Sequence, residues 1–245
     1  MNSMATLETM KDLRLFGMHQ WLNNAIETGL IHDLSTQDAL SHLIESEKEE
    51  RFDRRLKRLI KNTQFRFICH LEEIRYTAER NLEKKTILKI SELRWLRNGE
   101  HIVLTGCTGT GKTFLACAIG MKACLEGYRV QYVPANKLFY QLKYAKSCGN
   151  YVKFFEKLMK NELIIIDDFG LEVLDRESRM SLFEILENQT DKKSILFSSQ
   201  LPMESWFDVI GDKTLADAIC DRVISGSHFV CLEGDSLRRM KPKKS

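Results

Sequence analysis

The stretch Gly106-Cys107-Thr108-Gly109-Thr110-Gly111-Lys112-Thr113 decides the fold of this 245-residue chain, because it matches the pattern G-x-x-x-x-G-K-[ST] without a gap. The residues before it, 101–105, have the pattern of a short buried strand. Those after it, from Phe114 to Leu125, carry apolar side chains at helical spacing. Strand, glycine-rich turn and helix in this order predict a phosphate-binding loop.

Each residue type in the loop suits the binding of a nucleoside triphosphate. The glycines allow a tight backbone turn in which successive N–H groups face phosphate oxygens, and the following helix adds the positive end of its dipole. Lys112 is expected to reach the β- and γ-phosphates, and the hydroxyl of Thr113 to ligate Mg²⁺. We therefore expect ATP and Mg²⁺ to bind along the whole stretch from Gly106 to Phe114.

A second signal is the run Leu163-Ile164-Ile165-Ile166, which ends in Asp167 and Asp168. Carboxylates at the carboxyl end of a buried parallel strand face the ligand crevice of such sheets. Asp167 is the candidate Mg²⁺ ligand beside Thr113, and Asp168 is the candidate base for an attacking water. Ser199 and Gln200 follow the next strand, where a polar side chain can sense the γ-phosphate or belong to an ordinary turn.

Composition limits the class of protein. The seven cysteines are odd in number and include no C-x-x-C pair, which argues against a disulfide framework and a structural zinc site. No apolar run is long enough to span a bilayer, and the N-terminus has no signal-peptide pattern. We expect a cytoplasmic protein with no membrane partner.

The net charge is only +3, but basic residues are clustered. Residues 51–70 hold seven Lys or Arg and one acid, residues 136–160 hold six Lys and one acid, and residues 238–245 hold five bases. Such clusters are typical of nucleic-acid binding, although each can also be a solvated face. The candidate DNA-binding residues are Lys137, Lys143, Lys146, Arg54, Arg55 and Arg58.

The periodicity divides the chain in two. Residues 1–85 are expected to be helical throughout: one apolar stripe to Gly29, a helix starting at Ser35, and a third from Gln64 to Lys84. After a connection over residues 86–100, strands are expected at 101–105, 129–133, 163–166, 194–197 and 228–232, alternating with helices. This alternation predicts an α/β fold with a parallel five-stranded sheet. The predicted domains are a helical N-terminal domain, 1–85, for DNA binding or assembly, and an ATPase domain, 86–245.

The ordered set of motifs resembles the AAA+ ATPases of the initiator and helicase-loader clade, and most closely the IstB family of transposition helper ATPases. The resemblance covers nearly the whole chain, through Leu15-Phe16-Gly17-Met18, the phosphate loop, Ile166-Asp167-Asp168-Phe169-Gly170, Ser199-Gln200-Leu201-Pro202, Asp221-Arg222-Val223 and Gly234-Asp235-Ser236-Leu237-Arg238. It implies an AAA+ fold without the helical lid domain of most such proteins.

The resemblance also implies residue roles. Arg222 is similar to the arginine finger that reaches the γ-phosphate of a neighbouring subunit in rings or spirals on DNA; its alternative role is a helix-end pair with Asp217 or Asp221. Arg238 is similar to a second sensor of the nucleotide. The helical pair at 136–160 is similar to the insertion that lines the DNA path in the initiator clade, and it carries Lys137, Lys143 and Lys146.

The resemblance implies a DNA-stimulated ATPase that assembles as a homo-oligomer on duplex target DNA and recruits or activates a transposase. Three alternatives stay open at this point: a DnaC-like helicase loader, a nucleotide-gated DNA-bending module with incidental hydrolysis, and a small-molecule P-loop kinase. Only the nucleotide site follows from the residues themselves; the transposition role follows from the resemblance.

Overall fold

The computed structural model describes residues 3–188 and 193–237, and its contacts divide the chain into two compact units, Met1–Arg58 and Leu59–Ser245. The division falls after Arg58 and not after residue 85, inside a helix that the sequence analysis placed wholly in the N-terminal domain. No helix among the described residues is both long and apolar enough to cross a membrane.

The first unit consists of helices, as expected from the sequence. The apolar stripe before Gly29 is nevertheless two helices, because Arg14 adopts a left-handed backbone with φ of 59° and separates α1 from α2. Helix α3 begins where the sequence indicated: the Ser35 hydroxyl accepts a hydrogen bond from the N–H of Asp38 at 3.2 Å, which caps the first turn. The helices concerned are α1 (Ser3–Asp12), α2 (Phe16–Glu27) and α3 (Thr36–Thr63).

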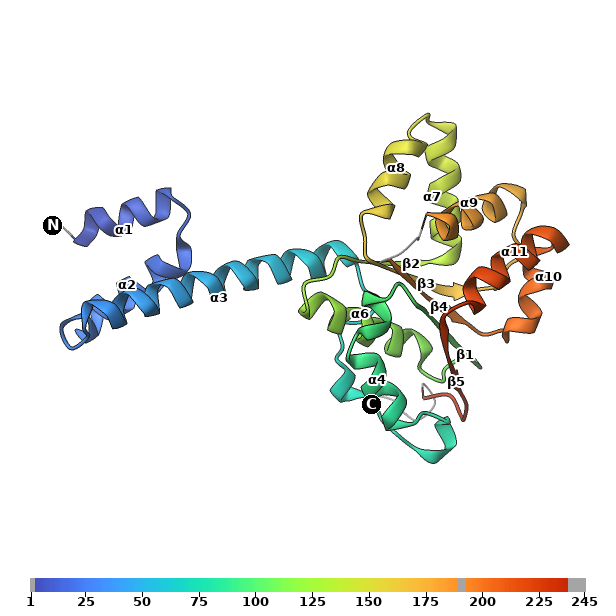
Figure 1. Ribbon diagram of the computed structural model, residues 1–245, viewed down its shortest axis with the longest axis horizontal. Coiled ribbons are helices and arrows are strands. Elements are labelled where there is room, and N and C mark those ends of the chain that lie inside the picture. Colours follow the sequence, from blue (N-terminus) through green and yellow to red (C-terminus); the bar gives the residue numbers. More distant parts are fainter. Residues whose placement is uncertain (1–2, 189–192, 238–245) are drawn as a thin grey trace, which may run out of the picture. The chain divides into compact units, whose positions relative to one another are not determined.

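The second unit contains the predicted parallel sheet, with strand order β2-β3-β4-β1-β5 (Figure 1). β1 therefore lies between β4 and β5, with Ile102 opposite both Leu196 and His228. All five strands fall within three residues of their predicted ranges. They are β1 (His101–Gly106), β2 (Val130–Pro134), β3 (Leu163–Phe169), β4 (Ser194–Ser199) and β5 (Ser227–Leu232).

Helices cover both faces of the sheet (Figure 1). Alternate strand residues face opposite sides, so that Val103, Ile164 and Phe197 join the helices of one face in a continuous buried core. The other face carries α6, which packs against four strands. The remaining helices are α4 (Lys84–Ser91), α5 (Arg94–Arg97), α6 (Lys112–Leu125), α7 (Ala135–Ser147), α8 (Tyr151–Met159), α9 (Arg176–Glu187), α10 (Trp206–Ile210) and α11 (Lys213–Ile224).

Residues 64–83, which we call the connecting segment, are not the predicted third helix. Gln64 takes φ of 56° and ends α3, and only two short 3-10 turns follow, Leu71–Glu73 and Ala78–Arg80. Cys69, Leu71 and Ile74 are buried, and the turn Leu71–Glu73 packs against α6 within the second unit. Tertiary contacts thus satisfy the apolar residues that suggested a helix, and two helices, α4 and α5, occupy the connection predicted for residues 86–100.

His101 gives the fold a defined dependence on pH. Its ring is buried, and Nδ1 accepts a hydrogen bond from the N–H of Ile195 at 3.1 Å, so β1 and β4 are joined through a neutral imidazole. Burial lowers the pKa of His101 below its ordinary value. Because the unfolded chain binds this proton more readily, the contribution of His101 to stability is present above about pH 6.5 and is lost as the pH falls below it.

We expect the free energy of unfolding, measured with urea, to be lower at about pH 5.5 than at about pH 8, because His101 must be charged in acid. In the variant His101→Gln, whose amide oxygen can accept from Ile195 without titrating, the difference should be smaller. An equal difference in both proteins would assign the acid sensitivity to other groups.

Candidate functional site

The loop between β1 and α6 has the backbone that a phosphate cradle needs. Gly106, Gly109 and Gly111 have φ of 138°, 85° and 95°, a region that favours glycine. A Cβ atom on Gly106 would lie 2.0 Å from the carbonyl oxygen of Leu232, so a larger residue does not fit there. Helix α6 begins at Lys112, and the N–H groups of its first turn have no acceptor within the helix. These groups and the helix dipole favour an anion at the loop.

Lys112 is buried, and its ammonium lies over the loop. Nζ donates to the carbonyl oxygens of Gly106 at 2.6 Å and Cys107 at 2.8 Å. These contacts place the ammonium at the loop, where a cation forms strong hydrogen bonds to phosphate oxygens. The arrangement therefore fits the triphosphate that the sequence predicted.

Thr113 and Asp167 meet as the sequence predicted for a Mg²⁺ site. The hydroxyl of Thr113 donates to Oδ1 of Asp167 at 3.2 Å, and the phenol of Tyr132 donates to Oδ2 at 2.6 Å. Burial and the adjacent carboxylate raise the pKa of Tyr132, so it remains a hydrogen-bond donor. One hydroxyl and one carboxylate fit Mg²⁺, which takes few protein ligands and completes its shell with phosphate and water.

Asp168 lines the same cavity but in an unusual backbone conformation. Its φ is 55°, a left-handed value that aspartate tolerates better than most residues. Nη1 of Arg66, in the connecting segment, lies 3.5 Å from Oδ2 of Asp168. The carboxylate proposed as the base thus has a cation beside it that sequence analysis did not anticipate.

Ser199 and Gln200 occupy different environments. Ser199 is fully buried: its hydroxyl donates to the carbonyl oxygen of Phe169 at 2.8 Å and accepts from the N–H of Leu201 at 3.1 Å. Those bonds join β4 to the end of β3. Ser199 does not line the cavity, whereas Gln200 does. Between the two residues predicted as phosphate sensors, the geometry favours Gln200.

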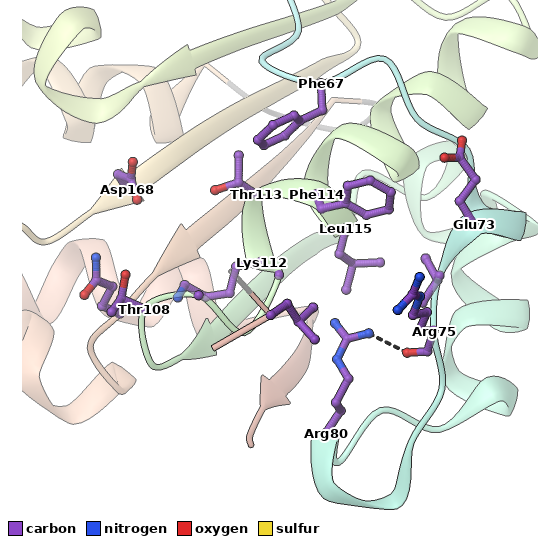
Figure 2. Close-up of a pocket in the computed structure, with 15 residues that line it drawn as sticks. Phe67, Glu73, Arg75, Arg80, Thr108, Lys112, Thr113, Phe114, Leu115 and Asp168 are labelled. Carbon is purple, nitrogen blue, oxygen red and sulfur yellow. Dashed lines mark hydrogen bonds between the residues drawn. The ribbon is translucent and has the colours of Figure 1, made fainter. Parts of the chain in front are cut away.

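Lys112, Thr113, Asp168 and Gln200 line one cavity of about 720 Å³ (Figure 2). Of the loop residues predicted to bind nucleotide, Gly106, Cys107 and Thr110 do not line it. Arg238, the predicted second sensor, lies outside the described residues. The connecting segment forms one wall of the cavity. The sequence analysis did not predict this wall, because it assigned the segment to a regular helix of the N-terminal domain. The lining residues are Phe67, Glu73, Ile74, Arg75, Arg80, Thr108, Gly109, Gly111, Lys112, Thr113, Phe114, Leu115, Asp168, Gln200 and Leu237.

Arg222 lies on α11 and does not line the cavity of its own chain. Its guanidinium forms an ion pair with Glu187 and not with Asp217 or Asp221, the partners considered from sequence. Nη1 donates to the carbonyl oxygen of Ala218 at 2.9 Å, and the group lies over the ring of Phe183, 4.7 Å from its centroid. The side chain remains 37% exposed.

The three candidate DNA-binding lysines on α7 differ in their surroundings. Lys137 is exposed, whereas Lys143 pairs with Asp175 and, together with a hydrogen bond from Ser178, lowers the pKa of that carboxyl to about 2. Lys146 donates to the hydroxyl of Ser181 at 3.2 Å and lies over the ring of Tyr151. Lys137 is consequently the clearest candidate for a phosphate contact.

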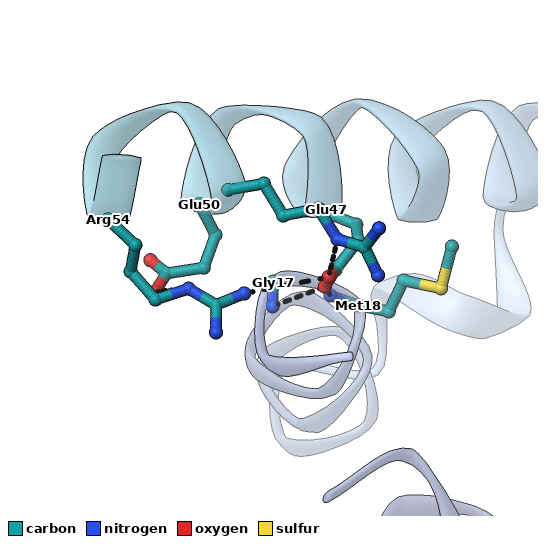
Figure 3. A network of polar contacts seen from close by, with 6 residues as sticks. Gly17, Met18, Glu47, Glu50 and Arg54 are labelled. Atoms are coloured by element: carbon teal, nitrogen blue, oxygen red, sulfur yellow. Dashed lines mark hydrogen bonds and ion pairs between the residues drawn. The ribbon is translucent and has the colours of Figure 1, made fainter. Parts of the chain in front are cut away.

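Within the first unit, Arg54 belongs to a network around Glu47 (Figure 3). Oε2 of Glu47 accepts from the N–H groups of Gly17 at 2.8 Å and Met18 at 3.3 Å, which caps α2 from α3. Burial raises the pKa of Glu47, but Arg51 and these N–H groups outweigh it, so the pKa is lowered. The close approach of α2 to α3 explains the glycine of Leu15-Phe16-Gly17-Met18. A Cβ at Gly17 would lie 2.2 Å from the carbonyl oxygen of Ser46.

The same network engages one of the three candidate arginines of the first unit. Nε of Arg54 lies 3.1 Å from Oε1 of Glu50, and its guanidinium lies over the ring of Phe16. Arg55 and Arg58 are exposed. Arg54 therefore has a structural role within the first unit.

Comparison with known proteins assigns the family. The chain is 35% identical over 240 residues to insertion sequence ATP-binding protein y4pL of Sinorhizobium fredii, covering 98% of each chain. It is 26% identical over 233 residues to the insertion sequence IS21 ATP-binding protein of Pseudomonas aeruginosa, covering 95% of this chain and 88% of that one.

Two solved structures share the fold of the second unit. The DnaC helicase loader has a TM-score of 0.54 at 19% identity, over 72% of this chain and 99% of that one. The replication initiator DnaA bound to AMPPCP and single-stranded DNA has a TM-score of 0.56 at 23% identity, over 68% of this chain but only 50% of that one. The predicted AAA+ fold is thus confirmed. The sequence model of the family described as "IstB-like ATP binding protein" matches residues 8–245, and the chain belongs to this family.

Proposed function

We propose that this protein hydrolyses ATP while assembled as a homo-oligomer on duplex DNA, and that it recruits or activates the transposase of an insertion sequence. The hydrolytic part rests chiefly on one observation: Lys112, Thr113 and Asp168 line one cavity, and Thr113 is hydrogen-bonded to Asp167. The mobile-element part rests on relatives named insertion sequence ATP-binding proteins.

In the proposed reaction, the oxygen of a water molecule bonds to the γ-phosphorus as the bond to the β-phosphate oxygen breaks. Asp168 accepts the proton of that water, and Gln200 orients it. Lys112 stabilises the charge that develops on the outer phosphates. Thr113 and Asp167 would hold Mg²⁺, which would supply positive charge to the phosphate oxygens.

The ion pair between Arg66 and Asp168 bears on the timing of this step. The guanidinium occupies the side of Oδ2 that faces it, where the attacking water would otherwise donate its hydrogen bond. Because both side chains are partly exposed, such a pair is worth only about 0–1 kcal/mol and can be exchanged for other contacts. We propose that Asp168 acts after Arg66 has released it.

The decisive experiment measures ATP turnover with and without duplex DNA, and then with an insertion-sequence transposase. We expect DNA to stimulate turnover, and the protein to bind the transposase in a pull-down with ATP. Binding to a replicative helicase and not to the transposase would favour a loader. ATP turnover that is unchanged by DNA but requires a small molecule as phosphate acceptor would favour a kinase.

DNA binding should be largely independent of sequence and steeply weakened by salt, because cations that contact phosphates release counterions. Lys137→Ala is expected to lower the slope of log affinity against log salt by about one. Lys85→Ala removes an exposed lysine of α4 and serves as the matched control. Charge reversal at Lys137, Lys143, Lys146, Arg54, Arg55 and Arg58 together, with unchanged affinity, would identify these groups as solvated faces.

A further inference from the structure

Arg80 stands directly against the phosphate loop, although no sequence pattern marks it. It ends the 3-10 turn Ala78–Arg80, and Nη2 donates to the carbonyl oxygen of Thr110 at 2.9 Å. Nη1 donates to the carbonyl oxygen of Arg75 (Figure 2). A Cβ atom on Gly111 would lie 2.8 Å from Nη2, so the guanidinium and the loop are in contact.

The charge of Arg80 is buried without an opposite charge. The residue is only 8% exposed, and the described residues place no carboxylate in an ion pair with it. Its Nε is buried with no hydrogen-bond partner among the described residues. Burial lowers the pKa of Arg80, but arginine stays charged because its ordinary value is so high. A buried and uncompensated cation is unfavourable unless an anion joins it.

The backbone holds Arg80 in this position from the other side. The carbonyl oxygen of Arg80 accepts from the N–H of Glu233 at 3.1 Å, after β5. A Cβ on Gly234 would lie 2.9 Å from the carbonyl oxygen of Glu79, so the two segments are closely packed. The guanidinium is therefore presented by a turn fixed between the phosphate loop and the segment that follows β5.

The position of Arg80 indicates which anion it meets. Figure 2 shows Lys112 between Asp168 on one side and Arg80 on the other, and all three line the cavity. Asp168 marks the side where the γ-phosphate would react, so Arg80 lies toward the inner phosphates. We propose that Arg80 is a nucleotide-binding residue that neutralises the inner phosphates common to ATP and ADP and thereby links nucleotide binding to the connecting segment. This inference rests on the ATP-binding site but not on hydrolysis.

The test measures equilibrium binding of ATP and of ADP, without DNA, to the full chain and to Arg80→Met, which keeps most of the stem but not the charge. We expect both nucleotides to bind roughly 10- to 100-fold more weakly, and by the same factor, as for loss of a charged hydrogen bond. Arg80→Lys, which keeps the charge but loses the fork, should lie between. Arg94→Met removes an exposed arginine outside the cavity and controls for net charge.

Melting temperatures separate binding from a structural bridge, because a nucleotide at fixed concentration stabilises the folded protein more when it binds more tightly. We expect the rise in Tm caused by ADP to shrink in Arg80→Met and Arg80→Lys. If Arg80→Met lowers Tm equally with and without ADP, and its affinity for ADP is unchanged, Arg80 has a purely structural role. A loss of affinity for ATP alone would overturn the assignment to the inner phosphates. Failure of DNA-stimulated turnover would leave these binding results unaffected.

Discussion

Replacing Lys112 with alanine should reduce ATP turnover by at least about 10²–10³-fold, the range found when one preorganised donor is removed from a transition state. The backbone of the loop would remain, but the cation that reaches the outer phosphates would be lost. Turnover is measured by phosphate release at saturating DNA, and ATP binding is measured by titration. Near-normal turnover in Lys112→Ala would contradict the proposed hydrolytic site.

Asp168→Asn is the companion variant, which separates ATP binding from turnover. Asparagine keeps the shape of aspartate and also tolerates the left-handed backbone at this position. It should bind ATP normally while losing turnover, since an amide cannot accept the proton of the water. Weak ATP binding in this variant would instead exchange the roles proposed for Asp167 and Asp168.

Arg222→Ala should bind ATP normally yet lose the stimulation that accompanies assembly, by about 10³–10⁵-fold if Arg222 acts as a finger in trans. Arg222 does not line the cavity of its own chain and is only partly exposed in its contact with Glu187. To reach a neighbouring site it must leave Glu187, so Glu187→Gln should make this arginine easier to release. The measurement is turnover against protein concentration with duplex DNA.

Mixing the two inactive variants tests the trans arrangement directly. A Lys112→Ala subunit can donate its own Arg222, and an Arg222→Ala subunit retains an intact phosphate loop. Their mixture should recover part of the activity at fixed total protein, because some interfaces combine an intact loop with an intact finger. No recovery at any ratio, together with turnover that is independent of concentration, would restrict Arg222 to its own chain, beside Glu187.

Local sequence predicted the parts of the site that lie on one strand-to-helix turn or one strand end. Gly106 to Thr113 and Asp167 are such parts, because their chemistry follows from adjacent residues. Tyr132, Arg66 and Arg80 reach the site from other segments, and no spacing in the sequence marks them. Ser199 shows the opposite error: its polar side chain at a strand end serves the backbone of Phe169 and not the cavity.

The misreading of the connecting segment has a similar cause. Cys69, Leu71 and Ile74 are buried although the backbone that carries them is irregular. Periodicity describes one face of a regular element, whereas an irregular chain can bury the same residues without any period. A left-handed residue such as Gln64, which ends α3, is not detectable from its type, because glutamine is uncommon in that conformation.

The strand order has a consequence for how the chain folds as it is synthesised. β1 carries the phosphate loop, yet its two neighbours, β4 and β5, are the last two strands among the described residues. A nascent chain that ends before Ser194 therefore exposes both edges of β1, and unpaired strand edges promote aggregation. Pairings so distant in sequence also form slowly. Synthesis must pass Leu232 before β1 is enclosed on both sides, so the nucleotide cannot assist folding until all five of these strands have been made.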